Sequence, residues 1–238
     1  MVEILFTADL DEFIDSEESR PQPAKNFIPE WYKNIPIDMP DNHNVFQSKI
    51  VPNLKTTKRC PSFANIFHED TYVVVSPCDV HIYNFQDKWF AKASHPNVDV
   101  HHHDDNQFVN HVPGKPIKAV FRIVTRYHCL LPKGYALRYI PMSLHFNQDY
   151  YATYGVIDQD KMTQLNIQLM ITTDKEEFLI KKGEPLCYII PYKKEKFNYT
   201  FKYMDQKLKR FIRKIGFITI SKFKGGYIQS ESHDYTKE

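Results

Sequence analysis

Residues 134–191 decide the fold, and they read GYALRYIPMSLHFNQDYYATYGVIDQDKMTQLNIQLMITTDKEEFLIKKGEPLCYIIP. Apolar and polar residues alternate in several short runs, which is the pattern of β-strands with one buried face. GYA at 134–136 opens such a run, GVIDQD at 155–160 indicates a sharp corner, and IKKGEPL at 180–186 indicates a turn. Glycine, proline and acidic residues at these points are typical of turns. The stretch therefore predicts a mainly β, antiparallel body.

In their order and spacing, these three phrases resemble the core of the trimeric dUTPase and dCTP deaminase superfamily. Members of that superfamily have a proline-glycine-tyrosine strand, a G-[VI]-I-D-x-D-Y-x-G turn and an I-x-x-G-x-[RP]-[IL]-[AC]-Q hairpin. The resemblance covers about a quarter of the 238-residue chain. It implies a jelly roll or distorted β-barrel like that of dUTPases, and a homo-oligomer, possibly a trimer.

Two phrases outside this stretch resemble a different group of proteins. FIPEWYKNIP at 27–36 and KRCPSF at 58–63 are similar to a family of uncharacterised proteins encoded by tailed bacteriophages, notably those of marine cyanobacteria. That resemblance implies a viral protein, located in the virion or in the host cytoplasm, with itself and other virion proteins as its partners.

Composition limits the classes of function. The 15 tyrosines and 17 phenylalanines supply a large core, and a net charge of +2 does not favour nucleic acid as a partner. No window contains the ~18 apolar residues of a membrane span, and the acidic N-terminal residues do not resemble a secretory signal. The four cysteines form no C-x-x-C pair, which argues against a zinc knuckle. We expect a reducing environment and no cofactor.

We expect three regions along the chain. Residues 1–70 contain several prolines that forbid long regular elements, so they predict an arm with short helices. Residues 71–192 form the β core, and 193–238 form a basic helix and tail. The arm carries Trp31 and Tyr32, which are too apolar for a solvated linker. These two residues contact either the body of the same chain or a partner subunit.

The clearest helix pattern is DQKLKRFIRKI at 205–215. Its apolar residues share one face, Asp205 can cap its N-terminus, and Gly216 is expected to end it before a last strand at 217–220. The remaining faces are basic. Lys209, Arg210 and Arg213 are therefore candidates for binding an acidic partner surface or nucleic acid. The alternative is a helix that packs its apolar side on the sheet and leaves its charges in solvent.

Asp158 is the candidate catalytic residue. In the dUTPases that the motif resembles, the aspartate at this place orients and deprotonates the attacking water as a general base. Gly155, Asp160 and Ser143 are further candidates for a nucleotide pocket. The alternative interpretation is a tight corner, in which Gly155 has a positive φ and Asp158 caps the backbone.

The chain departs from the dUTPase pattern at several positions. Lys161 stands where those enzymes have a tyrosine that stacks on the deoxyribose, and Thr163 stands where they have a glycine. Ser143 remains from the P-R-S-G phosphate-binding helix start, but its arginine and glycine are missing. Without the arginine and the helix N-terminus, a triphosphate loses its strongest donors.

The histidine-rich segment from His95 to His111 is the third candidate site. His101, His103, Asp105 and His111 could supply ligands for Zn, Ni or Fe, as in a metal-dependent oxygenase. Adjacent residues of a strand point to opposite faces, however, so consecutive histidines cannot all converge. The alternatives are a solvated loop, or a contact that responds to pH near 6 to 6.5.

These observations lead to one preferred function and two alternatives. The preferred interpretation is a non-enzymatic bacteriophage protein that uses a dUTPase-like β scaffold for assembly or binding. The first alternative is an enzyme that binds or hydrolyses dUTP or dCTP with Asp158 as its base. The second is a metal-dependent oxygenase that uses the histidine segment.

Overall fold

The computed structural model describes residues 2–37, 56–59, 61–67, 70–114, 116–158 and 160–223. The chain divides into two compact units. The first unit contains Met1–Phe27 and Glu69–Glu195, and the second contains Ile28–His68 and Lys196–Glu238. Cys60 and the end of the expected C-terminal tail, residues 224–238, lie outside the described residues.

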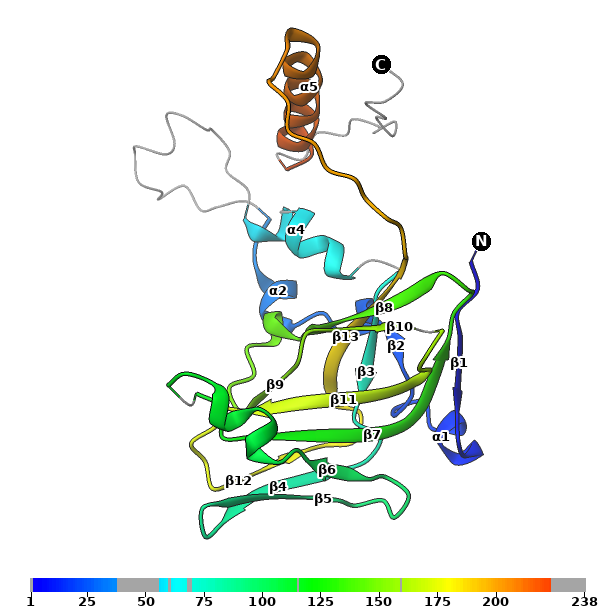
Figure 1. The fold of residues 1–238 in the computed structure, drawn as a ribbon, viewed down its shortest axis with the longest axis vertical. Helices are drawn as coiled ribbons and strands as arrows, with labels where there is room; N and C mark the ends of the chain where they lie inside the picture. Colours follow the sequence, from blue (N-terminus) through cyan, green and yellow to red (C-terminus); the bar gives the residue numbers. More distant parts are fainter. Residues whose placement is uncertain are drawn as a thin grey trace. The chain divides into compact units, whose positions relative to one another are not determined.

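The first unit contains two five-stranded sheets (Figure 1). The first has the order β1-β7-β11-β9, and β6 pairs with β7 beside β1. Its strands are β1 (Leu5–Ala8), β6 (Val100–His102), β7 (Ala119–Leu130), β9 (Tyr150–Ala152) and β11 (Gln164–Ile171). The second has the order β10-β8-β13-β3-β2. Its strands are β2 (Gln22–Pro23), β3 (Tyr72–Val75), β8 (Tyr135–Pro141), β10 (Gly155–Asp158) and β13 (Pro185–Lys193).

A third sheet of three strands has the order β12-β4-β5. Its strands are β4 (Val80–Phe85), β5 (Lys88–Ala93) and β12 (Glu177–Ile180). Every strand pair in the three sheets is antiparallel, and none of the three strand orders returns to its first strand. The mainly β, antiparallel architecture predicted from the alternation is therefore confirmed.

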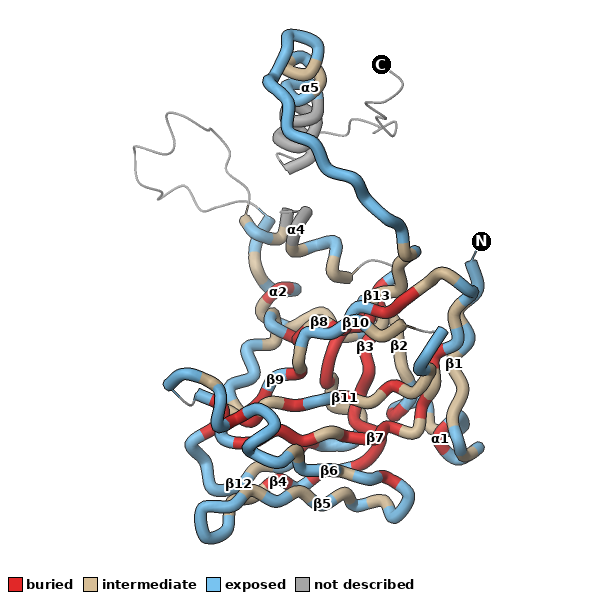
Figure 2. Tube along the Cα trace, viewed as in Figure 1, coloured by how far each residue is buried: buried red, intermediate tan, exposed pale blue. Residues whose placement is uncertain are grey.

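Strand β11 illustrates how the alternation builds the core. Leu165, Ile167, Leu169 and Ile171 are all buried, at 0–1% exposure, while the residues between them are more exposed (Figure 2). They belong to one hydrophobic cluster that draws residues from all three sheets. Burying a leucine or isoleucine side chain contributes about 1.5–3 kcal/mol, so this cluster is the main source of stability.

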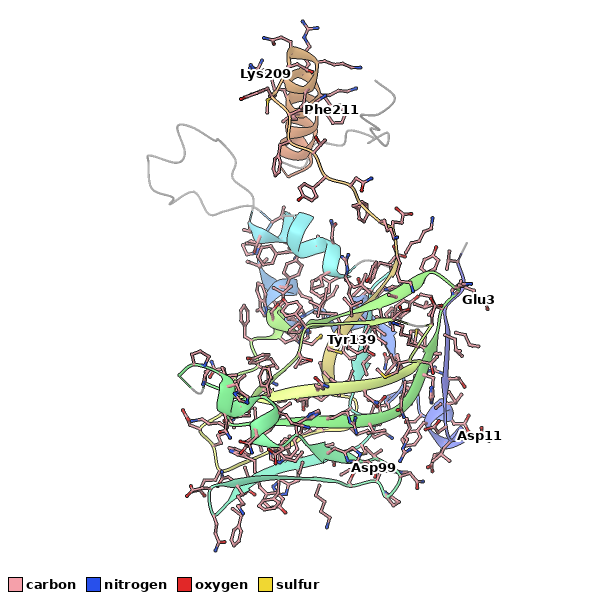
Figure 3. All side chains as sticks on the ribbon, in the orientation of Figure 1. Glu3, Asp11, Asp99, Tyr139, Lys209 and Phe211 are labelled. Carbon is pink, nitrogen blue, oxygen red and sulfur yellow. The ribbon has the colours of Figure 1, made fainter. Side chains whose placement is uncertain are left out.

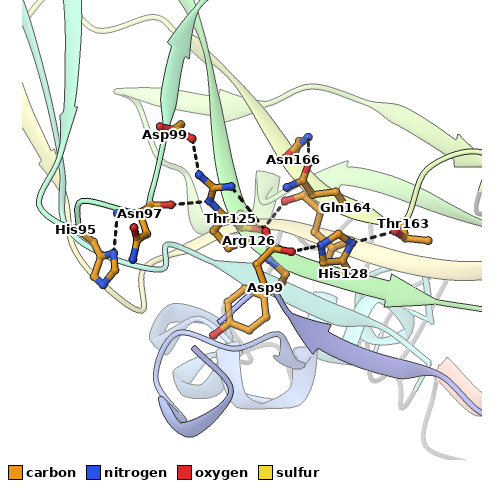
Figure 4. A network of polar contacts seen from close by, with 12 residues as sticks. Asp9, His95, Asn97, Asp99, Thr125, Arg126, His128, Thr163, Gln164 and Asn166 are labelled. Carbon is orange, nitrogen blue, oxygen red and sulfur yellow. Dashed lines mark hydrogen bonds and ion pairs between the residues drawn. The ribbon is translucent and has the colours of Figure 1, made fainter. Parts of the chain in front are cut away.

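The long strand β7 is irregular at Arg126, which has a φ of 65°. The register between β7 and β11 shifts beside it, as in a β-bulge. Polar contacts surround this point (Figure 4): Arg126 Nη2 lies 2.6 Å from Asp99 Oδ2, and His128 Nε2 lies 2.8 Å from Asp9 Oδ1. These contacts join β1, β7 and the segment before β6, so they hold β7 in its irregular course.

In the part of the chain that the structure describes, the helices are short except for one. The α-helices are α1 (Asp11–Asp15), α2 (Glu30–Asn34), α4 (Pro61–Ala64) and α5 (Gln206–Phe223). The 3-10 turns are η1 (Ala24–Phe27), η2 (Thr57–Arg59), η3 (Asn65–Phe67), η4 (Asp105–Gln107), η5 (Val109–His111) and η6 (Ser143–His145). In the described part of the chain, no helix combines the length and the apolar character needed to cross a membrane.

Helix α5 confirms one expectation and overturns another. Asp205 Oδ1 accepts a hydrogen bond of 2.8 Å from the backbone N–H of Leu208, as an N-cap does. The predicted end at Gly216 and the predicted strand at 217–220 are wrong, because α5 continues to Phe223. A single glycine costs a helix only about 1 kcal/mol relative to alanine, which does not suffice to end it.

Tyr127 offers a test of the core of the first unit. Its buried hydroxyl donates a 2.6 Å hydrogen bond to the carbonyl of Phe13 and lies 3.0 Å from Ser19 Oγ. We expect Tyr127→Phe to lower the free energy of unfolding by about 1–3 kcal/mol, because the carbonyl of Phe13 loses the buried hydroxyl as its donor. Urea unfolding measures this. Tyr154→Phe, at a side chain that is 74% exposed, is the matched control and should change little. Equal urea midpoints for the two variants would contradict a stabilising role for the Tyr127 hydroxyl.

Candidate functional site

Asp158 ends strand β10, where it pairs with Ala136 of β8. Its carbonyl accepts hydrogen bonds from the backbone N–H groups of Lys161 (2.9 Å) and Met162 (3.0 Å), so the chain turns after Asp158. The corner predicted at Gly155 is therefore misplaced. Gly155 is an extended strand residue without a positive φ, because the ladder with β8 already includes it.

The carboxylate of Asp158 is held by Lys194, the residue that follows β13. Lys194 Nζ lies 2.7 Å from Asp158 Oδ1 and 2.7 Å from Asp160 Oδ2. Asp158 Oδ1 also accepts a 3.2 Å hydrogen bond from the backbone N–H of Asp160. About one third of the Asp158 and Lys194 side chains is exposed. The backbone N–H of Lys194 donates to the carbonyl of Gly134 at 2.7 Å, which fixes where the ammonium group lies.

These contacts shift the pKa values of both Asp158 and Lys194 in the directions expected for an ion pair. The hydrogen bond from Lys194, followed by that from the Asp160 backbone, lowers the pKa of Asp158 below its usual value. The bonds to Asp158 and then Asp160 raise the pKa of Lys194. A general base is most effective when its pKa lies near the operating pH. A carboxylate that is ion-paired and more acidic than usual is therefore poorly suited to take a proton from water.

A cavity of about 860 Å³ lies in the first unit. Residues of the segment 141–151, the loop 172–175 and the start of β13 line it, together with Tyr154. Ser143, which is exposed in η6, is one of these residues. Asp158 and Asp160 do not line this cavity. The structure therefore does not bring Ser143 and Asp158 into one pocket.

Most charged groups in this cavity are already paired. Tyr150 Oη donates to Glu184 Oε1 at 2.8 Å, and Lys175 Nζ lies 2.8 Å from Asp149 Oδ2. Burial, and then the charge of Glu184, raises the pKa of the Tyr150 hydroxyl, so this group stays protonated. Lys175 is thus paired with Asp149, and Glu184 accepts a hydrogen bond from Tyr150. The cavity therefore offers a triphosphate few free charged donors.

His145 is the exception in this cavity. Burial lowers the pKa of its imidazole, although a hydrogen bond with the backbone of Phe27 opposes this shift. Its Nε2 is buried and has no partner in the part of the chain that the structure describes. Sequence reasoning did not select His145, because neither its burial nor the cavity beside it is visible in a local pattern.

Gly155 lines a second, smaller cavity of about 310 Å³, which Asp158 does not reach either. The four candidates for a nucleotide pocket are thus divided. Ser143 lies in the larger cavity and Gly155 in the smaller one, while Asp158 and Asp160 hold Lys194.

The histidine segment is spread over several elements. His101 lies in β6, His103 Nδ1 lies 3.2 Å from Gln107 Oε1, and His111 Nε2 lies 2.8 Å from the carbonyl of Asn106. Asp105, in η4, lies 3.6 Å from a different histidine, His102. Among the described residues, no group of three or more His, Cys, Asp or Glu side chains is placed to hold a metal ion.

Trp31 and Tyr32 lie on α2 in the second unit. Their rings form a T-shaped pair with centroids 5.5 Å apart, and the Tyr32 ring lies 5.4 Å from that of Phe67. The Tyr32 hydroxyl donates to the carbonyl of Lys58 at 3.2 Å. Tyr32 is 6% exposed. These contacts connect α2 with the segment 56–67 of the same unit. The contacts of Tyr32 are therefore intramolecular.

The basic candidates lie on α5, where Figure 3 labels Lys209 and Phe211. Arg210 and Arg213 are exposed, and Lys209 is partly exposed. No acidic residue lies in the first turn of α5, and Asp205 before it serves as the cap. This part of the helix therefore presents positive charge to solvent.

The segment before α5 carries a feature that sequence reasoning missed. Residues 197–203 read FNYTFKY, and the structure assigns them to no helix or strand. Their four aromatic side chains are 84–100% exposed: Phe197, Tyr199, Phe201 and Tyr203. The alternation with period two is visible in the sequence, but the lysines around it favour only the interpretation of 193–202 as a basic strand or extended segment.

Comparisons with known proteins identify no family. No protein-family model matches the chain, and no curated protein does. Among solved structures, the native EIAV dUTPase is similar with a TM-score of 0.33 and 10% identity, over 58% of this chain and 86% of that one. The dUTPase from phage phi11 of S. aureus has a TM-score of 0.28 and 10% identity, over 53% and 97%. These TM-scores are low, so the architecture rests on the strand pairing itself.

The ion pair of Asp158 predicts a dependence of stability on pH. Folding lowers the pKa of Asp158, so the ionised carboxylate stabilises the folded protein. This stabilisation is fully present at pH values above the pKa of Asp158 in the unfolded chain. It is lost as the pH falls through the lower pKa of Asp158 in the folded protein. Asp158→Asn should therefore destabilise the protein near neutral pH, and the difference from wild type should disappear well below 3.8, the ordinary value.

Urea unfolding between about pH 7 and pH 2.5 measures this difference. In a Lys194→Gln background, the effect of Asp158→Asn should be smaller, as a double-mutant cycle reveals. Asp174→Asn is the control, because Asp174 is 92% exposed and its pair with Lys118 should contribute little. A difference between Asp158→Asn and wild type that persists unchanged at the lowest pH would refute the pairing.

Proposed function

We propose that this protein is a non-enzymatic binding or assembly component built on a dUTPase-like β scaffold. The observation that carries the proposal is the position of Lys194 Nζ, 2.7 Å from both Asp158 Oδ1 and Asp160 Oδ2. In this arrangement the two carboxylates of the turn fasten β10 to the end of β13. Asp158 is a structural acceptor and not a catalytic base.

Two further observations support this function. Lys161 and Thr163 stand where a dUTPase would have its stacking tyrosine and its glycine. Ser143 lines a cavity that Asp158 does not share, and Lys175 in that cavity is paired with Asp149. A phosphoryl-transfer site needs its base, phosphate donors and metal around one reacting atom. These residues do not provide that arrangement.

The exposed segment 197–203 supports assembly. Aromatic residues at every second position place all four rings on one side of an extended chain, as in a strand that adds to a sheet edge. Solvent-exposed aromatic rings of this number are typical of interfaces. We assign this segment to contact with a second copy of the chain, in a homo-oligomer such as a trimer.

The proposed setting follows from the resemblance to bacteriophage proteins. In that setting the basic face of α5, with Arg210 and Arg213, binds acidic surfaces of other virion proteins. The protein then resides in the virion or in the host cytoplasm. Mass spectrometry of purified particles would find it at a fixed copy number in the first case and absent in the second.

The alternative function is binding or hydrolysis of dUTP or dCTP with Asp158 as the base. Its favouring observation is that about one third of the Asp158 carboxylate side chain is exposed, beside the turn at 158–162. A nucleotide with Mg²⁺ would then have to displace Lys194 from both carboxylates.

Incubation with dUTP or dCTP and Mg²⁺ distinguishes the two functions. We expect no turnover above the uncatalysed rate for wild type, because the base is engaged and the phosphate donors are missing. Lys194→Gln, which frees both carboxylates, should be equally inactive. Turnover by the wild type that is lost in Asp158→Asn would establish the alternative.

The role of the aromatic segment is tested by mass measurement in solution. Light scattering coupled to size exclusion should give a multiple of the 28.2 kDa monomer for wild type. Replacing the four aromatic residues by serine should give the monomer, since their burial drives association.

The matched control changes the three residues between them, with Asn198→Ser, Thr200→Ser and Lys202→Ser, and should retain the wild-type mass. A monomeric wild type, or a four-serine variant that stays oligomeric, would contradict the assigned role of the segment.

A further inference from the structure

The smaller cavity lies in the first unit, beside the edge of the sheet that ends in β10. It has a volume of about 310 Å³. Its lining residues come from β7, β8, β9, β10 and β11, from the segment that connects β9 with β10, and from the turn after β10. The residues that matter below are Arg122 of β7, Tyr139 of β8 and Asn166 of β11, and Figures 3 and 4 label the last two.

Three buried polar atoms without a hydrogen-bond partner belong to residues that line this one cavity. They are Arg122 Nε, Tyr139 Oη and Asn166 Oδ1, and the statement covers the described part of the chain. Tyr139 as a whole is only 5% exposed. Buried polar groups nearly always have a partner, so three such groups around one space indicate a polar occupant.

The guanidinium of Arg122, which is half-buried and has its Nε without a partner, favours a negative charge in the cavity. No ion pair joins Arg122 to a carboxylate among the described residues, and its cross-strand neighbours are His101 and Gln168, neither of which is acidic. A guanidinium binds a carboxylate better than any neutral acceptor, because the hydrogen bonds are charge-assisted and fit the planar group. An occupant with a carboxylate satisfies this requirement.

Asn166 requires a donor. Its Nδ2 donates to Gln164 Oε1 at 3.1 Å, which orients the amide and leaves Oδ1 as the free acceptor. A carboxylate alone cannot satisfy this oxygen, whereas a hydroxyl or ammonium group can. The hydroxyl of Tyr139 can donate to the occupant or accept from it, so it fits either group.

The rest of the lining is largely apolar. Ala152, Ile157, Met162 and Ile167 contribute alkyl or thioether groups to the cavity. The volume lies at the lower end of the range of small-molecule sites. An apolar substituent of the size of a phenyl ring would therefore complete the fit.

We propose that this cavity is a binding site for a small carboxylate that carries a hydroxyl or amino group on the adjacent carbon and an apolar side chain. The carboxylate binds Arg122, the adjacent donor binds Asn166, and Tyr139 contacts one of the two. The site is independent of Asp158, which does not line it, and of the aromatic segment 197–203. Its test therefore succeeds or fails separately from the proposed assembly function.

Four related probes test the proposal by calorimetry or by NMR line broadening. 3-Phenyllactate and phenylalanine contain all three required groups, 3-phenylpropionate lacks the adjacent donor, and 3-phenyllactamide lacks the charge. We expect 3-phenyllactate, phenylalanine or both to bind. 3-Phenylpropionate and 3-phenyllactamide should bind at least about tenfold more weakly, as the loss of one charge-assisted hydrogen bond implies. Binding of none of them, or equal binding of all four, overturns the proposal.

Variants then show which side chain binds which group of the ligand. Arg122→Gln should abolish binding of the probe that wild type prefers, and Asn166→Leu should remove the preference for 3-phenyllactate over 3-phenylpropionate. Lys92→Gln is the matched control, because it removes one positive charge from an exposed position on β5. Thermal melts identify a variant that does not fold. The comparison of the four probes on wild type tests the proposal even if a variant fails to fold. A crystal structure soaked with 3-phenyllactate that has only water on the three polar atoms would also overturn the proposal.

Discussion

Lys194 is the residue on which the interpretation of the first unit depends. Its backbone N–H binds the carbonyl of Gly134 before β8, and its ammonium group binds two carboxylates at the end of β10. One residue thus joins the end of β13 to its neighbour β8 and to the edge strand β10 beyond it. The same contacts engage the Asp158 carboxylate. They therefore underlie both the stability of this sheet corner and our proposal that Asp158 is not a catalytic base.

The two five-stranded sheets explain why the hollows lie where they do. Strand β9 pairs only with the last residues of β11, and β10 is the terminal strand of the other sheet. The chain passes from one sheet to the other between them, so the first half of β11 lacks a partner on that side. The smaller cavity forms there, where polar side chains of β7 and β11 meet the apolar residues of β10. A scaffold of this kind carries different functions according to the side chains at such edges.

The sequence predicted what depends on local pattern. The alternation gave the antiparallel β body, including the run that opens at 134–136 and becomes β8, and Asp205 was correctly identified as the cap of α5. Long-range pairs escaped prediction. Lys194 and Asp158 are 36 positions apart, and the three polar atoms of the smaller cavity come from three strands. Gly155 and Gly216 were misjudged for a related reason, since strand pairing and helix continuation overrode the turn preference of glycine.

The state of the Asp158 carboxyl group tests the central claim most directly. Its ¹³C resonance can be followed by NMR against pH, with and without a non-hydrolysable dUTP analogue and Mg²⁺. The account predicts that the carboxyl group titrates below 3.8 and that the analogue leaves both the midpoint and the chemical shift unchanged. A midpoint above that value, or a carboxyl resonance that moves when nucleotide and Mg²⁺ are added, would mean that Asp158 serves a nucleotide site and would contradict the account.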